Sequence, residues 1–237
     1  LTNTVVSGLS TTQVAAFTTV QVPNFSNAVI TNMNTTNVAA LTTNQVANLT
    51  ENQVKLLSTA QLSTMGTTDI TAITSTQLAA MSSAQVDSFS TAIVNLMSST
   101  QLQGITAAVV ATLGTDQIAA LTTSAVQGLL ANQVAALTTA QVDTLSTVSL
   151  QQLSSTQLQA LNTADVTALS STKIGVLQTT QLPNLLTQQV AVLSSTQIGA
   201  LSSSQLNSLN TQQIQALSTS SLAGISTTAL PSLLTTS

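Results

Sequence analysis

Large apolar residues recur along this chain at two fixed positions of an eight-residue unit, which we call an octad. Counted from residue 1, position 1 is Leu, Ile, Met or Phe and position 6 is Val, Ile or Leu in all 29 complete octads. No insertion or deletion breaks this register over residues 1–237. The sequence is therefore one continuous array of 29 octads with a partial unit at its end. Because it opens on Leu, we expect it to be an excerpt of a longer or processed chain.

The spacing of the apolar positions excludes two simple conformations. In one long α-helix, each octad would rotate the apolar positions by roughly 80°, so that they would wind around every face. In a plain strand, positions 1 and 6 would fall on opposite faces, because they are five residues apart. Each octad must therefore bend.

The polar positions indicate how each octad bends. Position 2 is Ser, Thr or Asn in 24 octads and position 5 is Gln in 17, which is the spacing of a helix capping box. The apolar residues at positions 1 and 6 then form the hydrophobic staple around that cap. Residues 9–16 contain the full set in Leu9, Ser10, Gln13 and Val14, and residues 153–160 repeat it. We therefore predict one short helix in each octad.

Glycine and proline mark the junctions between these helices. All three Pro fall at position 7, and all eight Gly fall at positions 2, 7 or 8. Residues that break helices are thus kept out of positions 3 to 6. A proline at position 7 also disfavours the α conformation at position 6, so the helices at these prolines should approach 3₁₀ geometry.

A helix this short is not stable alone in water, because isolated helices become marginal only at about 12–15 residues. Each octad must gain stability by packing its two large apolar side chains against other octads. The sequence therefore predicts an all-α solenoid of very short capped helices of one to two turns, with α or 3₁₀ geometry. A β-solenoid remains the alternative, since Thr, Val and Ile favour strands. The number of octads in each coil and the handedness are left open.

The composition removes most catalytic and metal-binding chemistry. The chain has two basic and six acidic residues, three Phe, and no His, Cys, Trp or Tyr. It therefore lacks the base of a Ser-His pair and the usual ligands of zinc and iron-sulfur sites. Two basic residues and three Phe provide too little positive charge and base stacking to bind nucleic acid. No run of apolar residues is long enough to span a membrane. We predict a protein that is not an enzyme, with no catalytic, cofactor-binding or metal site.

The few charged residues suggest structural roles. Glu51 and Lys55 are spaced as a weak surface pair on a helix. Asp69 and Asp165 stand at position 5, where an acid can still serve as a cap near the helix N-terminus. Lys173 stands at the same position, and the sequence offers no reason for it. The remaining acids are Asp87, Asp116 and Asp143. Because the six acids are spread over octad positions 3, 4, 5 and 7, they should not align in one row.

Some octads depart from the cap pattern. The departures are Leu130, Gln178 and Leu186 at position 2, and Val5, Val29, Ile93 and Val109 at position 5. They are either an exposed apolar docking stripe or drift in a redundant array, and we favour drift. Glycosylation sequons at Asn24, Asn34 and Asn48 are expected by chance in so Thr-rich a chain.

The octad L-[ST]-[ST]-x-Q-[VIL]-x-x resembles the tandem octapeptide arrays of very large secreted or surface proteins of bacteria. The resemblance covers the whole chain and brings no catalytic residues. It implies an extracellular scaffold, stalk or fibre, and hence a location outside the cell or at its surface.

The array favours a structural role in which solenoids stack as a filament subunit or as the stalk or scaffold of a surface adhesin. It has no insertions, both ends run in the ordinary repeat pattern, and few charges oppose association. We therefore expect self-association as a homo-oligomer or fibre, without nucleic acid or a membrane span, and leave glycans on Ser and Thr open. The alternative is a binding module, such as an ice-binding or surface-adhesion solenoid.

Overall fold

The computed structural model of the chain describes residues 8–226. Over these residues, one short helix lies in each octad from 9–16 to 217–224, and no strand is present. Residues 8–226 form 25 α-helices of four to six residues and two 3₁₀ helices of three residues. The predicted all-α class and the helix in each octad are confirmed, and the β-solenoid alternative is wrong.

The chain divides into two compact units, Leu1–Leu121 and Thr122–Ser237, which are described separately. The helices of unit 1 are α2 (Thr11–Ala15), η1 (Val22–Asn24), α3 (Asn27–Asn32), α4 (Thr35–Ala39), α5 (Thr43–Ala47), α6 (Glu51–Leu56), α7 (Thr59–Leu62), α8 (Thr67–Ile70), α9 (Ser75–Ala80), α10 (Ser83–Asp87), α11 (Thr91–Leu96), α12 (Ser99–Gly104), α13 (Ala107–Val110) and α14 (Thr115–Ala120). Those of unit 2 are α15 (Thr123–Gly128), α16 (Ala131–Ala136), α17 (Thr139–Thr144), α18 (Thr147–Gln151), α19 (Ser155–Ala160), α20 (Thr163–Ala168), α21 (Ser171–Gly175), η2 (Leu182–Asn184), α22 (Thr187–Ala191), α23 (Ser195–Gly199), α24 (Ser203–Ser208), α25 (Thr211–Ala216) and α26 (Thr219–Leu222).

The start and end of each helix follow from the octad sequence, as α19 illustrates. The Ser154 hydroxyl accepts a hydrogen bond from the backbone of Gln157, whose side chain accepts one from the backbone N–H of Ser154. At the other end, the N–H of Leu161 donates to the carbonyl of Leu158, and Leu161 then adopts an extended conformation. The leucine that opens the next octad therefore ends the helix of the octad before it. The predicted capping box is confirmed here and at Ser10 and Gln13.

Proline changes the helix type where it occurs at position 7. The octads with Pro23 and Pro183 hold the two 3₁₀ helices η1 and η2, whereas the other described octads hold α-helices. The ring of each proline removes a backbone donor and restricts the residue before it. The predicted 3₁₀ geometry is therefore confirmed at these two prolines. Pro231 lies outside the described residues.

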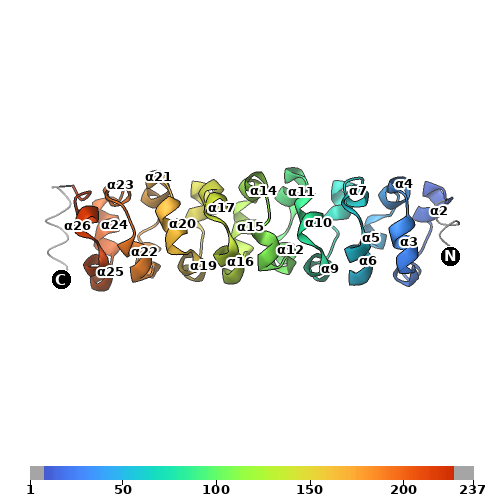
Figure 1. The fold of residues 1–237 in the computed structure, drawn as a ribbon, viewed down its shortest axis with the longest axis horizontal. Coiled ribbons are helices and arrows are strands. Elements are labelled where there is room, and N and C mark those ends of the chain that lie inside the picture. The colour runs from blue at the N-terminus through green and yellow to red at the C-terminus, as the bar shows by residue number, and fades with distance from the viewer. Residues whose placement is uncertain (1–7, 227–237) are drawn as a thin grey trace. The chain divides into compact units, whose positions relative to one another are not determined.

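Three octads form one coil of the solenoid in each unit. The helices that pack together lie three octads apart, so that α3 contacts α6 and α6 contacts α9 in unit 1. In unit 2, α16 contacts α19 and α22 contacts α25 in the same way. Figure 1 shows α3, α6 and α9 following one another along one side of unit 1. The coil length of three octads is a tertiary property that the repeat alone left open.

The two apolar columns form the core of each unit. Position 1 and position 6 side chains are buried in nearly every described octad, as Leu153 and Leu158 illustrate. The position 6 side chains are the more deeply buried of the two columns, as Leu158 at 1% and Leu153 at 4% exposure illustrate. The prediction that both columns point inward is confirmed for the described residues.

Candidate functional site

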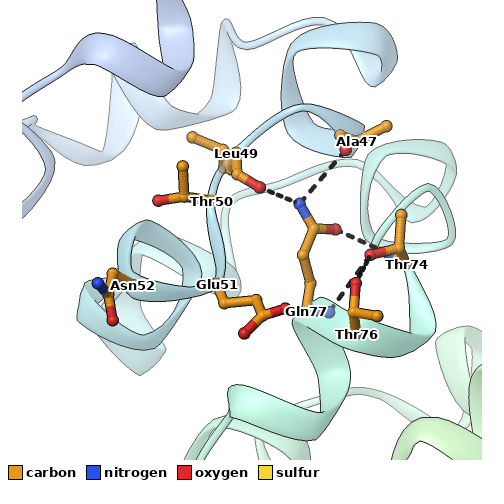
Figure 2. A pocket seen from close by; sticks show the side chains of 8 residues that line it. All are labelled: Ala47, Leu49, Thr50, Glu51, Asn52, Thr74, Thr76 and Gln77. Atoms are coloured by element: carbon orange, nitrogen blue, oxygen red, sulfur yellow. Dashed lines mark hydrogen bonds between the residues drawn. The ribbon is translucent and has the colours of Figure 1, made fainter.

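The most regular polar feature of the molecule is the glutamine at position 5, and Figure 2 shows one example, Gln77. Its Oε1 accepts a hydrogen bond from the N–H of Thr74 at 2.7 Å, which caps its own helix. Its Nε2 donates to the carbonyls of Val46 at 3.0 Å and Leu49 at 2.6 Å, in the coil before. The side chain is only 2% exposed. One buried amide therefore caps a helix and fastens two coils together.

The same bridge recurs through both units. In unit 2, Gln157 Nε2 donates to the carbonyls of Val126 at 2.9 Å and Leu129 at 2.8 Å. The acceptors always lie 28 to 31 residues earlier, at the junction where one octad passes into the next. The other glutamines that bridge coils within a unit are Gln45, Gln53, Gln61, Gln85, Gln101, Gln117, Gln181, Gln189, Gln197, Gln205 and Gln213.

The sequence pattern revealed only half of this role. The capping spacing predicts the acceptor function of Oε1, but the donor function of Nε2 depends on which octads are neighbours. A signal was present in the sequence nonetheless. Glu would cap a helix N-terminus at least as well as Gln, because the helix dipole favours an anion there, yet no octad has Glu at position 5.

A second set of amides links coils in the opposite direction along the chain. Asn95 and Gln151, both at position 7, donate to the carbonyls of Ala120 and Val176, each 25 residues later. The distances are 2.8 Å and 2.9 Å. These side chains lie nearer the surface than the position 5 glutamines, so their contribution to stability is smaller.

A surface hollow of about 540 Å³ lies over the Gln77 bridge. It is lined by Ala47, Leu49, Thr50, Glu51, Asn52, Thr74, Thr76 and Gln77. The hydroxyl of Thr74 caps α9 and contacts Thr76, and the amide of Gln77 is occupied by the bridge. Glu51 supplies the single carboxylate of this lining. The hollow therefore offers hydrogen-bonding groups but does not place a nucleophile beside a base.

The structure gives Lys173 a partner that the sequence did not reveal. Its Nζ lies 3.1 Å from Oδ1 of Asp143, and the two side chains are 17% and 52% exposed. Asp143 lies 30 residues before Lys173. It stands between Val142 and Leu145, whose carbonyls a glutamine in place of Lys173 would reach by the register of the other bridges. The lysine thus replaces the amide bridge by an ion pair to the same coil.

The ion pair that the sequence did predict does not form. Glu51 and Lys55 lie in the first and last turns of α6, and no ion pair joins them. Both are exposed, and each stands at the helix end where the dipole favours its charge. Asp87 and Asp116 are also exposed. The only ion pair among residues 8–226 is that of Lys173 and Asp143.

The two acids at position 5 behave differently. Asp165 caps α20 as predicted, because its Oδ2 accepts a hydrogen bond from the N–H of Asn162 at 3.0 Å. Burial raises the pKa of the Asp165 carboxyl, and the hydrogen bond from Asn162 opposes this only in part. Asp69 instead accepts a hydrogen bond from the hydroxyl of Thr43 in the coil before, at 2.7 Å.

The docking-stripe interpretation of the irregular octads is wrong for the residues at position 5. Val29, Ile93 and Val109 are buried in the core and are at most 8% exposed. Val5 lies outside the described residues.

At position 2, Leu130 is exposed, Leu186 is half-buried, and Gln178 is exposed. The backbone N–H of each still donates to the glutamine three residues later. The glutamine half of the capping box is therefore kept without a cap hydroxyl, and the N–H of each glutamine donates to the backbone carbonyl of position 2.

The three sequons lie at exposed helix ends in unit 1. The Nδ2 groups of Asn24 and Asn48 donate to the carbonyls of Val20 and Asn44, four residues earlier. Asn34 caps α4, its Oδ1 accepting from the N–H of Asn37. Each of the three asparagines therefore has a structural role, because its side chain makes a hydrogen bond at the end of a helix.

Residues 8–226 lack two further features, a cluster of metal ligands and a membrane-spanning helix. No three Asp or Glu side chains come together in this part of the chain, so it contains no cluster that could hold a metal ion. None of its helices is long and apolar enough to cross a membrane.

Comparison with known protein families finds one match. The profile of the ALTTAQ repeat matches residues 110–147 and 174–211, which together are about a third of the chain. No curated protein matches the chain. The match and the regular helices confirm that the chain is a tandem octapeptide-repeat array.

Proposed function

We propose that this array of octapeptide repeats, which are similar to the ALTTAQ repeat, is a structural protein. It associates with further copies of itself by stacking one coil on another. In this role it is the subunit of a filament or the stalk or scaffold of a surface adhesin, secreted or held at the cell surface. The observation that carries the proposal is the chemical complementarity of the two faces of a coil.

Each interior coil has donors on one face and acceptors on the other. The Nε2 group of Gln157 points to the coil before it, while the carbonyls of Leu158 and Leu161 accept from Gln189 in the coil after it. Any coil face left uncovered is therefore complementary to the opposite face of the same chain. Contacts of this kind are head-to-tail and generate open-ended assemblies.

The first described coil of unit 1 presents such a donor face. Gln13 and Gln21 are exposed. Gln13 caps α2, and Gln21 accepts from the N–H of Thr18 in the turn before η1. Among residues 8–226, neither Nε2 group has an acceptor. Phe17 and Phe25, both at position 1, are half-buried and pack edge to face at 4.9 Å. A further coil would cover these rings and accept from the two amides, whether it belongs to a second copy or to more of the same repeats.

The low charge of the chain favours such association. Two basic and six acidic residues leave a net charge of −4 on 237 residues. Proteins of this size remain dispersed partly through the repulsion of many surface charges, which is weak here.

The proposal is tested on the 237-residue chain by electron microscopy and light scattering. We expect fibres or oligomers that grow with protein concentration. Changing Gln13 and Gln21 together to Glu should abolish them, since each carboxylate would face carbonyl oxygens. Changing Gln188 and Gln212 to Glu adds the same charge at exposed sites elsewhere and should leave association unchanged. Dispersed monomers of the unaltered chain at all concentrations would contradict the proposal.

The alternative is an ice-binding surface built from the many Ser and Thr residues, and the cap geometry argues against it. The hydroxyls at position 2 are turned toward their own helices, as those of Ser154 and Thr74 illustrate. They are therefore not free to order water. The exposed hydroxyls at position 3 alternate between Ser and Thr, as at Ser155 and Thr187, so they do not form a regular row of Thr methyl groups. A measurement of thermal hysteresis on the dispersed chain separates the two proposals, and we expect none.

A further inference from the structure

We propose that Asp165 is held as a neutral carboxylic acid between two coils of unit 2, and that the stability of this contact therefore depends on pH. The residue stands in α20 at position 5, where the bridging glutamines stand in other octads. It is the single buried acid of the described residues, at 1% exposure.

The register of the glutamine bridges places carbonyl oxygens opposite this carboxyl. Glutamines donate to carbonyls 31 and 28 residues earlier, as Gln189 does to Leu158 and Leu161 at 2.8 Å and 2.6 Å. The equivalent carbonyls for residue 165 are those of Val134 and Leu137. A glutamine would present an N–H to these oxygens, whereas an ionised aspartate presents a negative oxygen.

The carboxyl has one satisfied oxygen and one without a partner. Oδ2 accepts from the N–H of Asn162, but Oδ1 is buried and makes no hydrogen bond. Aspartate is one methylene shorter than glutamine, so Oδ1 does not reach the position of the amide nitrogen. A buried, unpaired charge is far more costly than a buried neutral acid.

No cation compensates for a charge at this site. The helices packed against α20 are α17 and α22. Asp143 is the charged residue of α17, and α22 has none. The nearby cation is Lys173 in α21, and its ammonium is engaged with Asp143 at the surface. The surroundings of Asp165 therefore favour the protonated form.

The direction of the pKa change agrees with this geometry and sets the sign of the effect. Burial raises the pKa of Asp165 above its ordinary value of 3.8. Below pH 3.8 the group is protonated in both the folded and the unfolded chain, and the coil contact is at its strongest. As the pH rises toward the folded-state pKa, the unfolded chain is favoured by release of the proton, and stability is lost.

The experiment compares Asp165→Asn with the unaltered chain by thermal unfolding between pH 3 and pH 8. Asparagine keeps the size and the cap acceptor but has no proton to lose. We expect equal melting temperatures near pH 3 and a higher melting temperature for Asp165→Asn, by a few degrees, near pH 8. Asp69→Asn is the matched control, and it should retain the pH dependence of the unaltered chain. Equal effects of Asp165→Asn at both pH values would overturn the proposal.

A second measurement on the unaltered chain does not depend on any variant. The chain has six acidic side chains, so their carboxyl carbons can be resolved by NMR. The carboxyl carbon of Asp165 should titrate at a pH above 3.8, the ordinary pKa of an aspartate side chain. Titration of Asp165 at or below this pH would also overturn the proposal.

Discussion

At the scale of a residue, the glutamine at position 5 acts in two directions because its amide carries both an acceptor and donors. Oε1 satisfies an amide at the start of its own helix, and Nε2 satisfies carbonyls at the end of another. Both groups would otherwise be buried without partners, which costs about 1–3 kcal/mol for each. This explains why Gln predominates at a position where Glu would suffice as a cap.

We expect Gln157→Leu to lower the free energy of unfolding by about 1–3 kcal/mol, because it removes the cap on Ser154 and the bridge to Val126 and Leu129. Gln13→Leu removes a cap alone and should cost less, about 1 kcal/mol or under. Urea denaturation of the two variants measures the difference. Equal losses would show that the bridge contributes nothing beyond the cap.

Lys173→Gln provides the reverse test, since it restores the common residue. A glutamine here would donate to the carbonyls of Val142 and Leu145, by the register of the other bridges. A hydrogen bond contributes about 0.5–1.5 kcal/mol, whereas a partly exposed ion pair contributes about 0–1 kcal/mol. We expect Lys173→Gln to be as stable as the unaltered chain or more stable, in urea denaturation at high salt. Lys173→Ala, which removes the ion pair without a bridge, should be the less stable variant.

At the scale of an element, the helices are stable only in the company of their neighbours. Helices of four to six residues lie far below the length at which a helix persists in water. Each one buries its position 6 side chain and the next position 1 side chain, which contributes roughly 1.5–3 kcal/mol for each side chain. Where helices three octads apart approach most closely, small residues at position 8 are required.

Gly104 is such a residue, because a Cβ at this position would overlap the backbone of Ser75 in the coil before. We expect Gly104→Ala to lower the free energy of unfolding by about 1–3 kcal/mol through this overlap.

Gly114 is the contrasting case, because its surroundings leave ordinary space for a Cβ and it stands at the N-cap of α14. Gly114→Ser should not lower stability, and it gains the cap hydroxyl of the common octad. Thermal unfolding of both variants checks these expectations. A neutral Gly104→Ala would mean that the coils can move apart at this contact.

At the scale of the whole molecule, stability is a sum of octads and the contacts between them, as in other repeat proteins. The repeating structural unit of this sum is the coil, which is three octads long. Because the octads are chemically similar, removing a full coil should leave each remaining octad with an equivalent neighbour.

Deleting residues 153–176 removes three octads of unit 2 and should leave a folded chain with the same helical signal per residue. Deleting residues 153–164 removes one and a half octads, which breaks the phase of apolar and cap positions. We expect this shorter deletion to lower the melting temperature more than the longer one. Circular dichroism with thermal unfolding makes the comparison. The opposite order would contradict the assignment of the octad as the folding unit.

The sequence by itself determined the octad, the helix in each octad, its caps and its two buried columns. These features depend on residues that are at most eight positions apart, such as Ser154, Gln157 and Leu161. Local hydrogen bonding and helix geometry decide them, so they can be predicted without knowing any distant neighbour.

Only the tertiary structure decided which octads meet. The number of octads in a coil, the bridge made by Nε2 of Gln157, the ion pair of Lys173 with Asp143 and the burial of Ile93 all depend on contacts about 24 to 31 residues apart. Nearly identical octads could pair at several spacings with similar local chemistry. The choice among those spacings depends on how the helices pack side by side around a common core, which the repeat pattern alone does not determine.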